Sequence, residues 1–143
     1  DMDERIGRFL SKHHVATLAT VAEDGSPYCC NIFYAYDADN DTLVFSSDIK
    51  TAHAGHFTTD ARVAASVVLE SKAVGTLRGT QMTGRIIRPE VDELDKARKR
   101  YLKRFPYAAV MSLELWIMRI DSVKHTDNRL GFGVKLKWTR KEL

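Results

Sequence analysis

The chain has 143 residues, of which 44% are hydrophobic and 29% charged, and its formal net charge is +3. This composition is typical of one globular domain over residues 1–143 and excludes an intrinsically disordered chain. No apolar run approaches the roughly 20 residues that a membrane-spanning helix needs, and the acidic N-terminal residues do not resemble a secretory signal.

The first half of the chain predicts a helix followed by a three-stranded meander. Apolar residues at helical spacing predict the helix over residues 2–13. Small, β-branched and aromatic residues then predict three strands, over residues 15–21, 28–37 and 42–47. The short turns between them, one of which contains Asp24 and Gly25, favour antiparallel pairing. A short helix is predicted next, over residues 48–57, with Ser47 or Asp48 as its N-cap.

The second half predicts four more strands and one long helix. The strands cover residues 62–70, 77–88, 113–125 and 131–138, and glycines at 79 and 84 suggest bends or bulges in the second of them. The helix runs from Pro89 to Pro106. So many strands in a short chain must hide their edges, and closure into a barrel does so. The predicted fold is α+β, mainly β: an antiparallel barrel of six to seven strands with about three short helices.

The two cysteines of the chain, Cys29 and Cys30, are adjacent in sequence. Neighbouring side chains on a strand point to opposite faces, so these two are poorly placed to pair. Without a disulfide framework, a reducing cytoplasm is the simplest expected location.

The junction between the third strand and the next helix is a candidate anion site. Ser46 and Ser47 are followed closely by Lys50 and Thr51. Backbone N–H groups at a helix N-terminus attract anions, and lysine adds a full positive charge. The pattern indicates either a phosphate-binding site or an ordinary cap beside a solvated lysine. Asp48 weighs against phosphate because its carboxylate competes for the same amides.

The second strand has two faces of different character. Alternation groups Cys30, Ile32 and Tyr34 on one face, and on the other it groups Cys29, Asn31 and Phe33. An asparagine beside a phenylalanine is unusual for a plain core face and suits hydrogen bonding to a flat heterocycle. The alternative is an aromatic core strand in which Asn31 binds the backbone.

Polar side chains on the fifth strand form a second candidate surface. Gln81 and Thr83 share a face with Gly79, and Gly84 follows. Two glycines beside a polar stripe permit close approach of a ligand to the backbone. The alternative is a pair of bulges beside a stripe that faces solvent.

Histidines and basic residues give weaker indications. His53 and His56 are three residues apart, but zinc needs three or four protein ligands and no third ligand stands out, so no metal site is predicted. Six of the nine residues 96–104 are basic, which indicates either nucleic-acid binding or a solvated helix face. Acidic residues on the same helix balance this charge, so nucleic acid is not an expected partner.

Several segments together carry a resemblance to a known family. They are Leu43-Val44-Phe45-Ser46-Ser47, Lys50-Thr51-Ala52-His53, Asp60-Ala61-Arg62-Val63, Arg78-Gly79-Thr80-Gln81, Arg104-Phe105-Pro106, Thr126-Asp127-Asn128 and Leu130-Gly131-Phe132-Gly133. Over nearly its whole length the chain resembles the pyridoxamine 5′-phosphate oxidase-like FMN-binding split barrels, and within them the YhbP-like branch.

The resemblance implies a homodimer with FMN at the subunit interface and an oxidoreductase of unknown substrate. It assigns the isoalloxazine ring to the second strand, from Cys29 to Tyr34, with Gln81 approaching it. It assigns the phosphate to Ser46, Ser47, Lys50 and Thr51. Lys135 and Trp138 are expected to contribute from the partner chain.

Two departures from the family pattern affect these expectations. The oxidases carry two adjacent basic residues at the phosphate helix, where this chain has Lys50 followed by Thr51, and an arginine common on the second strand is Cys29 here. Weaker phosphate binding is expected, and pyridoxamine phosphate oxidation itself is not. The alternative function is a non-enzymatic carrier of haem or another small ligand on the same barrel, with His53 or His125 as candidate axial ligands.

Overall fold

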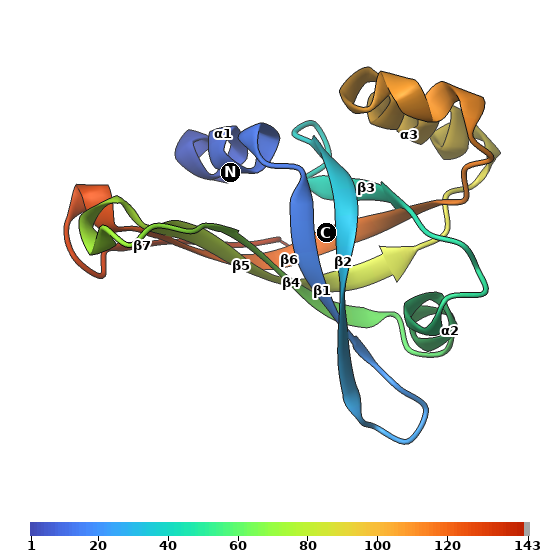
Figure 1. The fold of residues 1–143 in the computed structure, drawn as a ribbon, viewed down its shortest axis with the longest axis horizontal. Coiled ribbons are helices and arrows are strands. Elements are labelled where there is room, and N and C mark those ends of the chain that lie inside the picture. The colour runs from blue at the N-terminus through green and yellow to red at the C-terminus, as the bar shows by residue number, and fades with distance from the viewer. Residues whose placement is uncertain (142–143) are drawn as a thin grey trace.

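The computed structural model describes residues 1–141 and contains three α-helices and seven strands (Figure 1). The helices are α1 (Glu4–Lys12), α2 (Ala52–Thr59) and α3 (Val91–Arg104). The strands are β1 (Val15–Val21), β2 (Pro27–Asp37), β3 (Thr42–Ser46), β4 (Arg62–Leu69), β5 (Arg78–Ile87), β6 (Leu115–Asp127) and β7 (Lys135–Thr139). Short 3₁₀ turns cover Val74–Thr76, Pro106–Val110 and Asn128–Leu130.

The strands form an antiparallel sheet that closes into a six-stranded barrel with one additional strand. Their order is β3-β2-β1-β4-β5-β6-β7, and β3 also pairs with β6. The first part of β6, from Leu115 to Arg119, closes the barrel against β3, whereas its later part, from Ser122 to Thr126, pairs with β7. The mainly β, α+β barrel predicted from the sequence is confirmed.

A bulge in β6, opposite Thr83 and Gly84 of β5, lies where β6 exchanges β3 for β7, and its extra residue is Asp121. Thr83 pairs with Ser122 but Gly84 pairs with Ile120, so the register shifts by one residue. A Cβ atom at Gly84 would lie 2.0 Å from the carbonyl oxygen of Arg119, so only glycine fits. At Gly79, by contrast, the pairing continues without a shift, and the predicted irregularity is wrong there.

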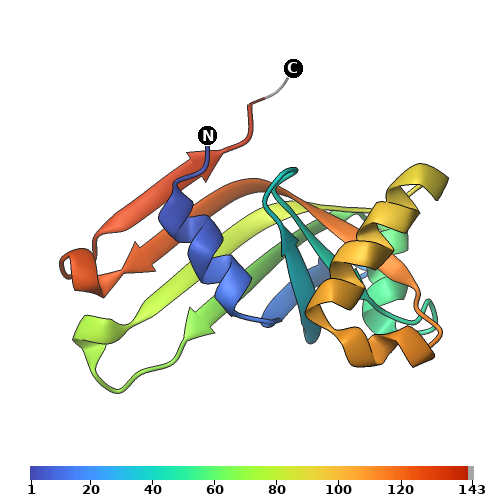
Figure 2. The same cartoon turned by 90° about the horizontal axis from the view of Figure 1, so that it is seen from above.

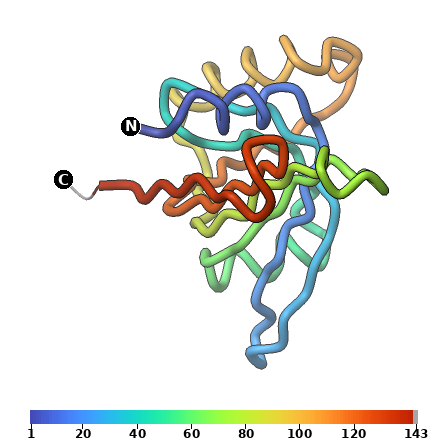
Figure 3. The backbone as a smooth tube through the Cα atoms, turned by 90° about the vertical axis from the view of Figure 1, so that its left-hand side faces the viewer, coloured from blue at the N-terminus to red at the C-terminus, as the bar shows by residue number. Residues whose placement is uncertain are grey.

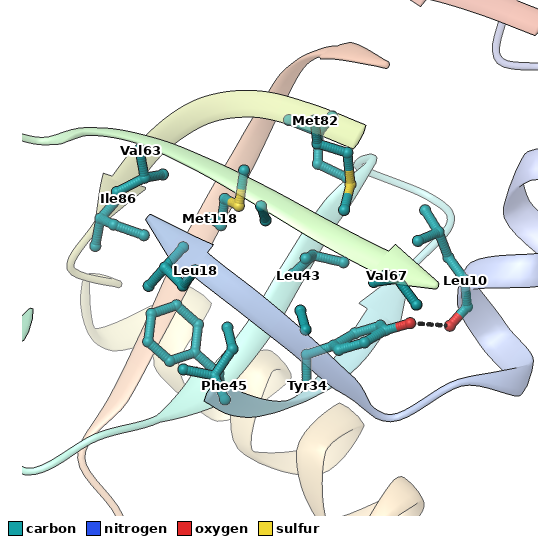
Figure 4. Packing of buried hydrophobic residues seen from close by; sticks show 14 of the residues in the cluster. Leu10, Leu18, Tyr34, Leu43, Phe45, Val63, Val67, Met82, Ile86 and Met118 are labelled. Carbon is teal, nitrogen blue, oxygen red and sulfur yellow. Dashed lines mark hydrogen bonds between the residues drawn. The ribbon is translucent and has the colours of Figure 1, made fainter. Parts of the chain in front are cut away.

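Alternating side chains fill the barrel from inside. Leu18, Tyr34, Phe45 and Met118 are fully buried in one core cluster (Figure 4). The phenolic O–H of Tyr34 donates a 2.7 Å hydrogen bond to the backbone oxygen of Leu10, which fastens α1 to the barrel. A second, smaller cluster lies under α3 and consists of Ala35, Val44, Ala97, Tyr101, Phe105, Ala108, Leu115 and Ile117.

Figure 2 shows α1 lying across the long strands β5 and β6, while α3 covers the opposite end of the barrel. The β1–β2 hairpin projects away from the remaining chain (Figure 3). No helix within residues 1–141 is long and apolar enough to cross a lipid bilayer.

Helix α2 begins later than predicted. It starts at Ala52, and its N-cap is Thr51, whose Oγ1 accepts a 3.3 Å hydrogen bond from the Ala54 N–H. The Asp48 carboxylate instead accepts from the N–H of Lys50 at 2.8 Å and holds residues 48–51 in a turn. The prediction of Ser47 or Asp48 as the cap is therefore wrong.

Helix α3 and the last strand each begin later than the sequence predicts, α3 at Val91 instead of Pro89. The first turn of α3 points into solvent, because Val91 is 84% and Leu94 43% exposed. The buried residues of α3 are Ala97 and Tyr101, further along the helix. The last strand starts at Lys135 rather than at residue 131, since Gly131 and Gly133 adopt positive φ values in the preceding turn.

Candidate functional site

The outward face of β2 carries the polar and aromatic side chains that the sequence grouped together. Cys29 and Asn31 are exposed, and Phe33 is 54% exposed. Ile32 and Tyr34 point into the barrel core, and Cys30 is half-buried against it. A ligand on the outer face therefore meets the first three side chains and not the other three.

A row of exposed polar side chains crosses the outer face of the sheet from β2 to β7. Strand pairing places its members opposite one another in the order Asn31, Thr17, Ser66, Gln81, Lys124 and Lys137. All six are exposed, and the Thr17 hydroxyl donates a 3.1 Å hydrogen bond to Oδ1 of Asn31. We call this set the polar row. It connects the predicted ring-binding face of β2 with Gln81.

Small residues beside the polar row leave a groove on this face. The next row along the same strands consists of Cys29, Ala19, Ala64, Thr83, Ser122 and Thr139. The groove has a volume of about 590 Å³, and its lining includes Gln81, Lys124 and Trp138. Sites for small organic ligands typically measure about 300–1,000 Å³. The groove is therefore large enough for a flat heterocycle.

The predicted phosphate junction forms a compact cluster around His53. Nε2 of His53 lies 2.9 Å from Oγ of Ser47 and 3.3 Å from Oγ1 of Thr51. Burial, and secondarily the charge of His56, lowers the pKa of His53 below its ordinary value. Ser46 is half-buried at the end of β3, and Lys50 is exposed. The structure thus brings Ser47, Thr51 and His53 together, with Lys50 as the nearby cation in sequence.

Most backbone amides of the junction are already used within the protein. The N–H of Ile49 donates to Oε2 of Glu114 at 3.0 Å, and those of Lys50 and Thr51 donate to the side chain and backbone of Asp48. In addition, Nε1 of Trp116 donates a 2.9 Å hydrogen bond to the backbone oxygen of Ser47. An anion here would therefore depend on hydroxyl groups, the first-turn amides of α2 and Lys50.

Glu114 and much of the polar row were missed by the sequence prediction. Glu114 is 65 positions away from Ile49 in sequence, and nothing local to either residue indicates their contact. Thr17, Ser66, Lys124 and Lys137 each lie at outward positions of alternating strands, but only the strand order shows that they form one row.

The junction and the groove are separate in this chain. Helix α2 packs at the end of the barrel, where Nδ1 of His56 lies 2.9 Å from Oγ1 of Thr20 and the His56 ring contacts Tyr28. Thr20 is buried and therefore faces the interior, whereas the polar row faces outward. None of Ser46, Ser47, Lys50 and Thr51 is among the described residues that line the groove.

The sequence profile described as pyridoxamine 5′-phosphate oxidase matches residues 2–127 of the chain. The chain belongs to the pyridoxamine 5′-phosphate oxidase family. Within the family it is 47% identical over 135 residues to the UPF0306 protein YhbP of Salmonella paratyphi B, a match that covers 94% of this chain and 91% of the relative. The UPF0306 protein YhbP of Salmonella typhi matches to the same extent. The resemblance to the YhbP-like branch is thereby confirmed.

Solved structures share the fold of this family member at low sequence identity. A structure described as a haem-binding protein from Mycobacterium smegmatis superposes with a TM-score of 0.74 and 23% identity, and covers 88% of this chain. The match spans about half of that longer protein, 52% of its length. A structure described as a FAD-binding protein from Mesorhizobium loti gives a TM-score of 0.67 and 18% identity, over 85% of this chain and 90% of that one.

The two histidines considered as haem ligands already lie within hydrogen-bonding distance of side chains of this protein. His125 is 1% exposed, its Nδ1 lies 2.7 Å from Oγ1 of Thr80, and its ring packs against Phe9. His53 is held between Ser47 and Thr51. Within residues 1–141 no group of three or more His, Cys, Asp or Glu side chains is placed to hold a metal ion.

The basic stretch 96–104 of this family member uses part of its charge in internal contacts. Arg100 pairs with Asp37 at 3.3 Å, and Lys99 pairs with Asp95 at 3.0 Å. Arg104 donates to the backbone oxygen of His13 at 3.1 Å and contacts Nδ1 of His14 at 2.8 Å. Arg100 and Arg104 therefore tie α3 to the end of β2 and to the residues that follow α1.

Proposed function

We propose that this protein binds FMN as a homodimer and serves as a flavin-dependent oxidoreductase of unknown substrate. The observation that carries the proposal is the polar row beside a groove of about 590 Å³ on an otherwise bare sheet face. Membership of the pyridoxamine 5′-phosphate oxidase family supports a flavin as the occupant. Bound flavin supplies hydride and electron-transfer chemistry, and the protein supplies binding and orientation.

The side chains present fit the ring of the cofactor. Gln81 lines the groove, and its amide can both donate and accept hydrogen bonds, as the edge of an isoalloxazine requires. Small residues such as Ala19 and Ala64 also line it and permit a flat ring to approach the sheet. Asn31 and Phe33 are exposed on β2 beyond Thr17 and are not among the described residues that line the groove, so they would contact only a ligand that extends past it.

The phosphate end fits less tightly. Ser47, Thr51 and Lys50 would hold it, but the Ile49 amide is taken by Glu114 and only one lysine supplies charge at the junction itself. A single lysine and two hydroxyls bind phosphate more weakly than two adjacent cations do. We therefore expect FMN to bind weakly enough to be lost during purification and recovered on reconstitution.

The separation of the junction and the groove supports the homodimer in this proposal. A second copy packed against the outer face would bring the junction of one chain towards Lys135 and Trp138 on β7 of the other. Lys135 is exposed on the outer face. Trp138 borders the groove, but it pairs with the buried Val123 and packs against the barrel core, with the Arg140 guanidinium 5.5 Å from its ring centre.

FMN titration with matched variants tests the proposal. Reconstituted protein should show bound-flavin absorption and a higher melting temperature. Gln81→Ala and Lys50→Met should each weaken FMN binding about tenfold, equivalent to about 1.4 kcal/mol. Lys103→Met, an exposed change on α3, should leave binding unchanged. Protein that shows neither bound-flavin absorption nor thermal stabilisation in excess FMN contradicts the proposal, and a Soret band on haem titration would favour the haem carrier instead.

Light scattering on a sizing column tests the dimer. Ser66→Arg introduces a bulky charge in the middle of the polar row and should yield a monomer that no longer binds FMN. Ser112→Arg, at an exposed position before β6, is the matched control and should remain a dimer. A monomeric parent protein that binds FMN fully would overturn the interface assignment.

A further inference from the structure

A basic cavity lies between α1 and the ends of β5 and β6, on the side of the sheet opposite the polar row. Its volume is about 230 Å³. Five cationic side chains line it, together with one carboxylate and the buried His125 and Phe9. The cations are Arg5, Arg8, Lys12, Arg78 and Arg129, and the carboxylate belongs to Asp127. We call it the α1 cavity.

Helix geometry and strand register build the α1 cavity. Arg5, Arg8 and Lys12 are three and four positions apart, so they share one face of α1. The same helix packs on the sheet through Phe9, whose ring lies 5.0 Å from that of His125. Arg78 stands directly opposite Asp127 across the β5–β6 pair, so both point to the same side of the sheet.

Internal ion pairs neutralise only part of this charge. Asp127 is 2% exposed and accepts from Nε and Nη2 of Arg129 at 3.0 and 2.8 Å. Arg5 pairs with Asp3 at 2.9 Å, and Arg8 lies 3.6 Å from Glu4 in an exposed and therefore weak pair. Lys12 and Arg78 have no ion-pair partner among residues 1–141.

Arg78 provides the observation that points to a ligand. Its Nε is buried and has no hydrogen-bond partner among the described residues. A buried donor without an acceptor is unfavourable, and more so when it belongs to a charged group. The Arg78 side chain lines the α1 cavity, so an anion bound there would lie next to this unsatisfied donor.

We propose that the α1 cavity binds the phosphate or diphosphate group of a small phosphorylated molecule, with Arg78 and Lys12 as the principal contacts. Guanidinium groups match the geometry of phosphate oxygens, and a lysine adds a point charge. At about 30 Å³ per water molecule, the cavity has room for roughly eight waters. This is enough space for a diphosphate group but too little for a whole nucleotide. The remainder of the molecule would project past α1 into solvent.

The α1 cavity is distinct from the proposed FMN groove. On β5 and β6 the pair Thr80–His125 faces α1, while the next pair, Gln81–Lys124, belongs to the polar row on the opposite face. The same two strands therefore present one ligand site on each side. An anion bound behind the sheet is separate from the flavin, and the two sites can be tested independently.

Calorimetric titration with inorganic pyrophosphate tests the proposal. Arg78→Met and Lys12→Met should each weaken binding about tenfold, equivalent to about 1.4 kcal/mol. Arg85→Met is the matched control, since Arg85 is exposed on the same strand beyond the bulge and does not line the α1 cavity. Lys12 is exposed on α1, so Lys12→Met keeps the test valid should Arg78→Met fold poorly.

Competition separates the α1 cavity from the FMN groove. Lys50→Met should retain full pyrophosphate affinity, and saturating FMN should not displace pyrophosphate. The absence of pyrophosphate binding at millimolar concentrations overturns the proposal, as does equal weakening by Arg85→Met and Arg78→Met. Displacement of pyrophosphate by FMN would also overturn it, because the anion would then occupy the flavin phosphate site.

Discussion

The two faces of the sheet formed by β1, β4 and β5 differ in composition, although alternate residues of the same strands form them. The inner face carries Leu18, Ala65 and Met82, all of which are buried in the barrel. The outer face carries the polar row, one position away on each strand. The inner side chains are buried by other residues of the same chain, whereas the outer side chains are small or polar and mostly exposed. The difference teaches that stability and binding depend on separate sets of side chains, which single substitutions can distinguish.

Gly84→Ala should have the largest effect, because it alters the backbone that both faces share. The new Cβ would lie 2.0 Å from the Arg119 carbonyl oxygen, so β5 and β6 must separate. We expect a loss on the order of 4 kcal/mol in the free energy of unfolding, measured in urea. Gly75→Ala is the control: no atom lies within 4 Å of the added Cβ, so the free energy of unfolding should change by less than about 0.5 kcal/mol. Equal losses in the two variants would show that the bulge does not require glycine.

The neighbouring pair Leu18 and Thr17 compares the inner face with the outer face directly. Leu18→Ala leaves a cavity in the core and should cost about 2–5 kcal/mol. Thr17→Ala removes only an exposed hydrogen bond to Asn31 and should cost no more than about 0.5 kcal/mol. Urea unfolding of both variants measures the difference, and comparable losses would contradict the assignment of faces.

Tyr34→Phe should weaken the attachment of α1 to the barrel. The change leaves the buried Leu10 carbonyl without its 2.7 Å hydrogen bond and should cost about 1 kcal/mol. Hydrogen exchange should rise in α1 more than in β5. Tyr107→Phe, at a position that is 65% exposed, is the control and should leave both stability and exchange unchanged.

Acidic pH should give the smallest and most gradual effect. Burial lowers the pKa of His125 below its model-peptide value of 6.5, although Asp127 opposes the shift, and burial lowers the pKa values of His13 and His53 in the same direction. The unfolded chain therefore binds more protons below about pH 6.5, so the stabilisation is complete above that pH and is lost as the pH falls through the folded-state values. His125→Gln should reduce the slope of unfolding free energy between about pH 7 and pH 5. An unchanged slope would contradict this role of His125.

Much of the fold is encoded locally and was accessible from the sequence. Alternation separated the two faces of β2 correctly, with Ile32 and Tyr34 inside and Asn31 and Phe33 outside. The start of α2 was accessible only in part: the Asp48–Lys50 turn and the Thr51 cap are local, but Glu114 takes the Ile49 amide from 65 positions away. Helix capping rules read only neighbours in sequence.

The candidate site was predictable only in part, for a related reason. Gln81 and Asn31 were identified individually from unusual polar positions on strands. Thr17, Ser66, Lys124 and Lys137 give no such signal, because an isolated polar residue at an outward position is ordinary. Their alignment depends on strand order and register, which are properties of the whole sheet.

The exchange of partners along β6 also bears on aggregation. Beyond the bulge, Ser122 to Thr126 would present unpaired backbone groups if β7 did not cover them. In the chain, β7 is only five residues long and carries Lys135 and Lys137 on its exposed side. Short length and lysines discourage the addition of another strand. The last strand β7 therefore covers the edge of β6 without itself favouring further pairing. Removing β7 would leave the later part of β6 open to pairing with strands of other chains.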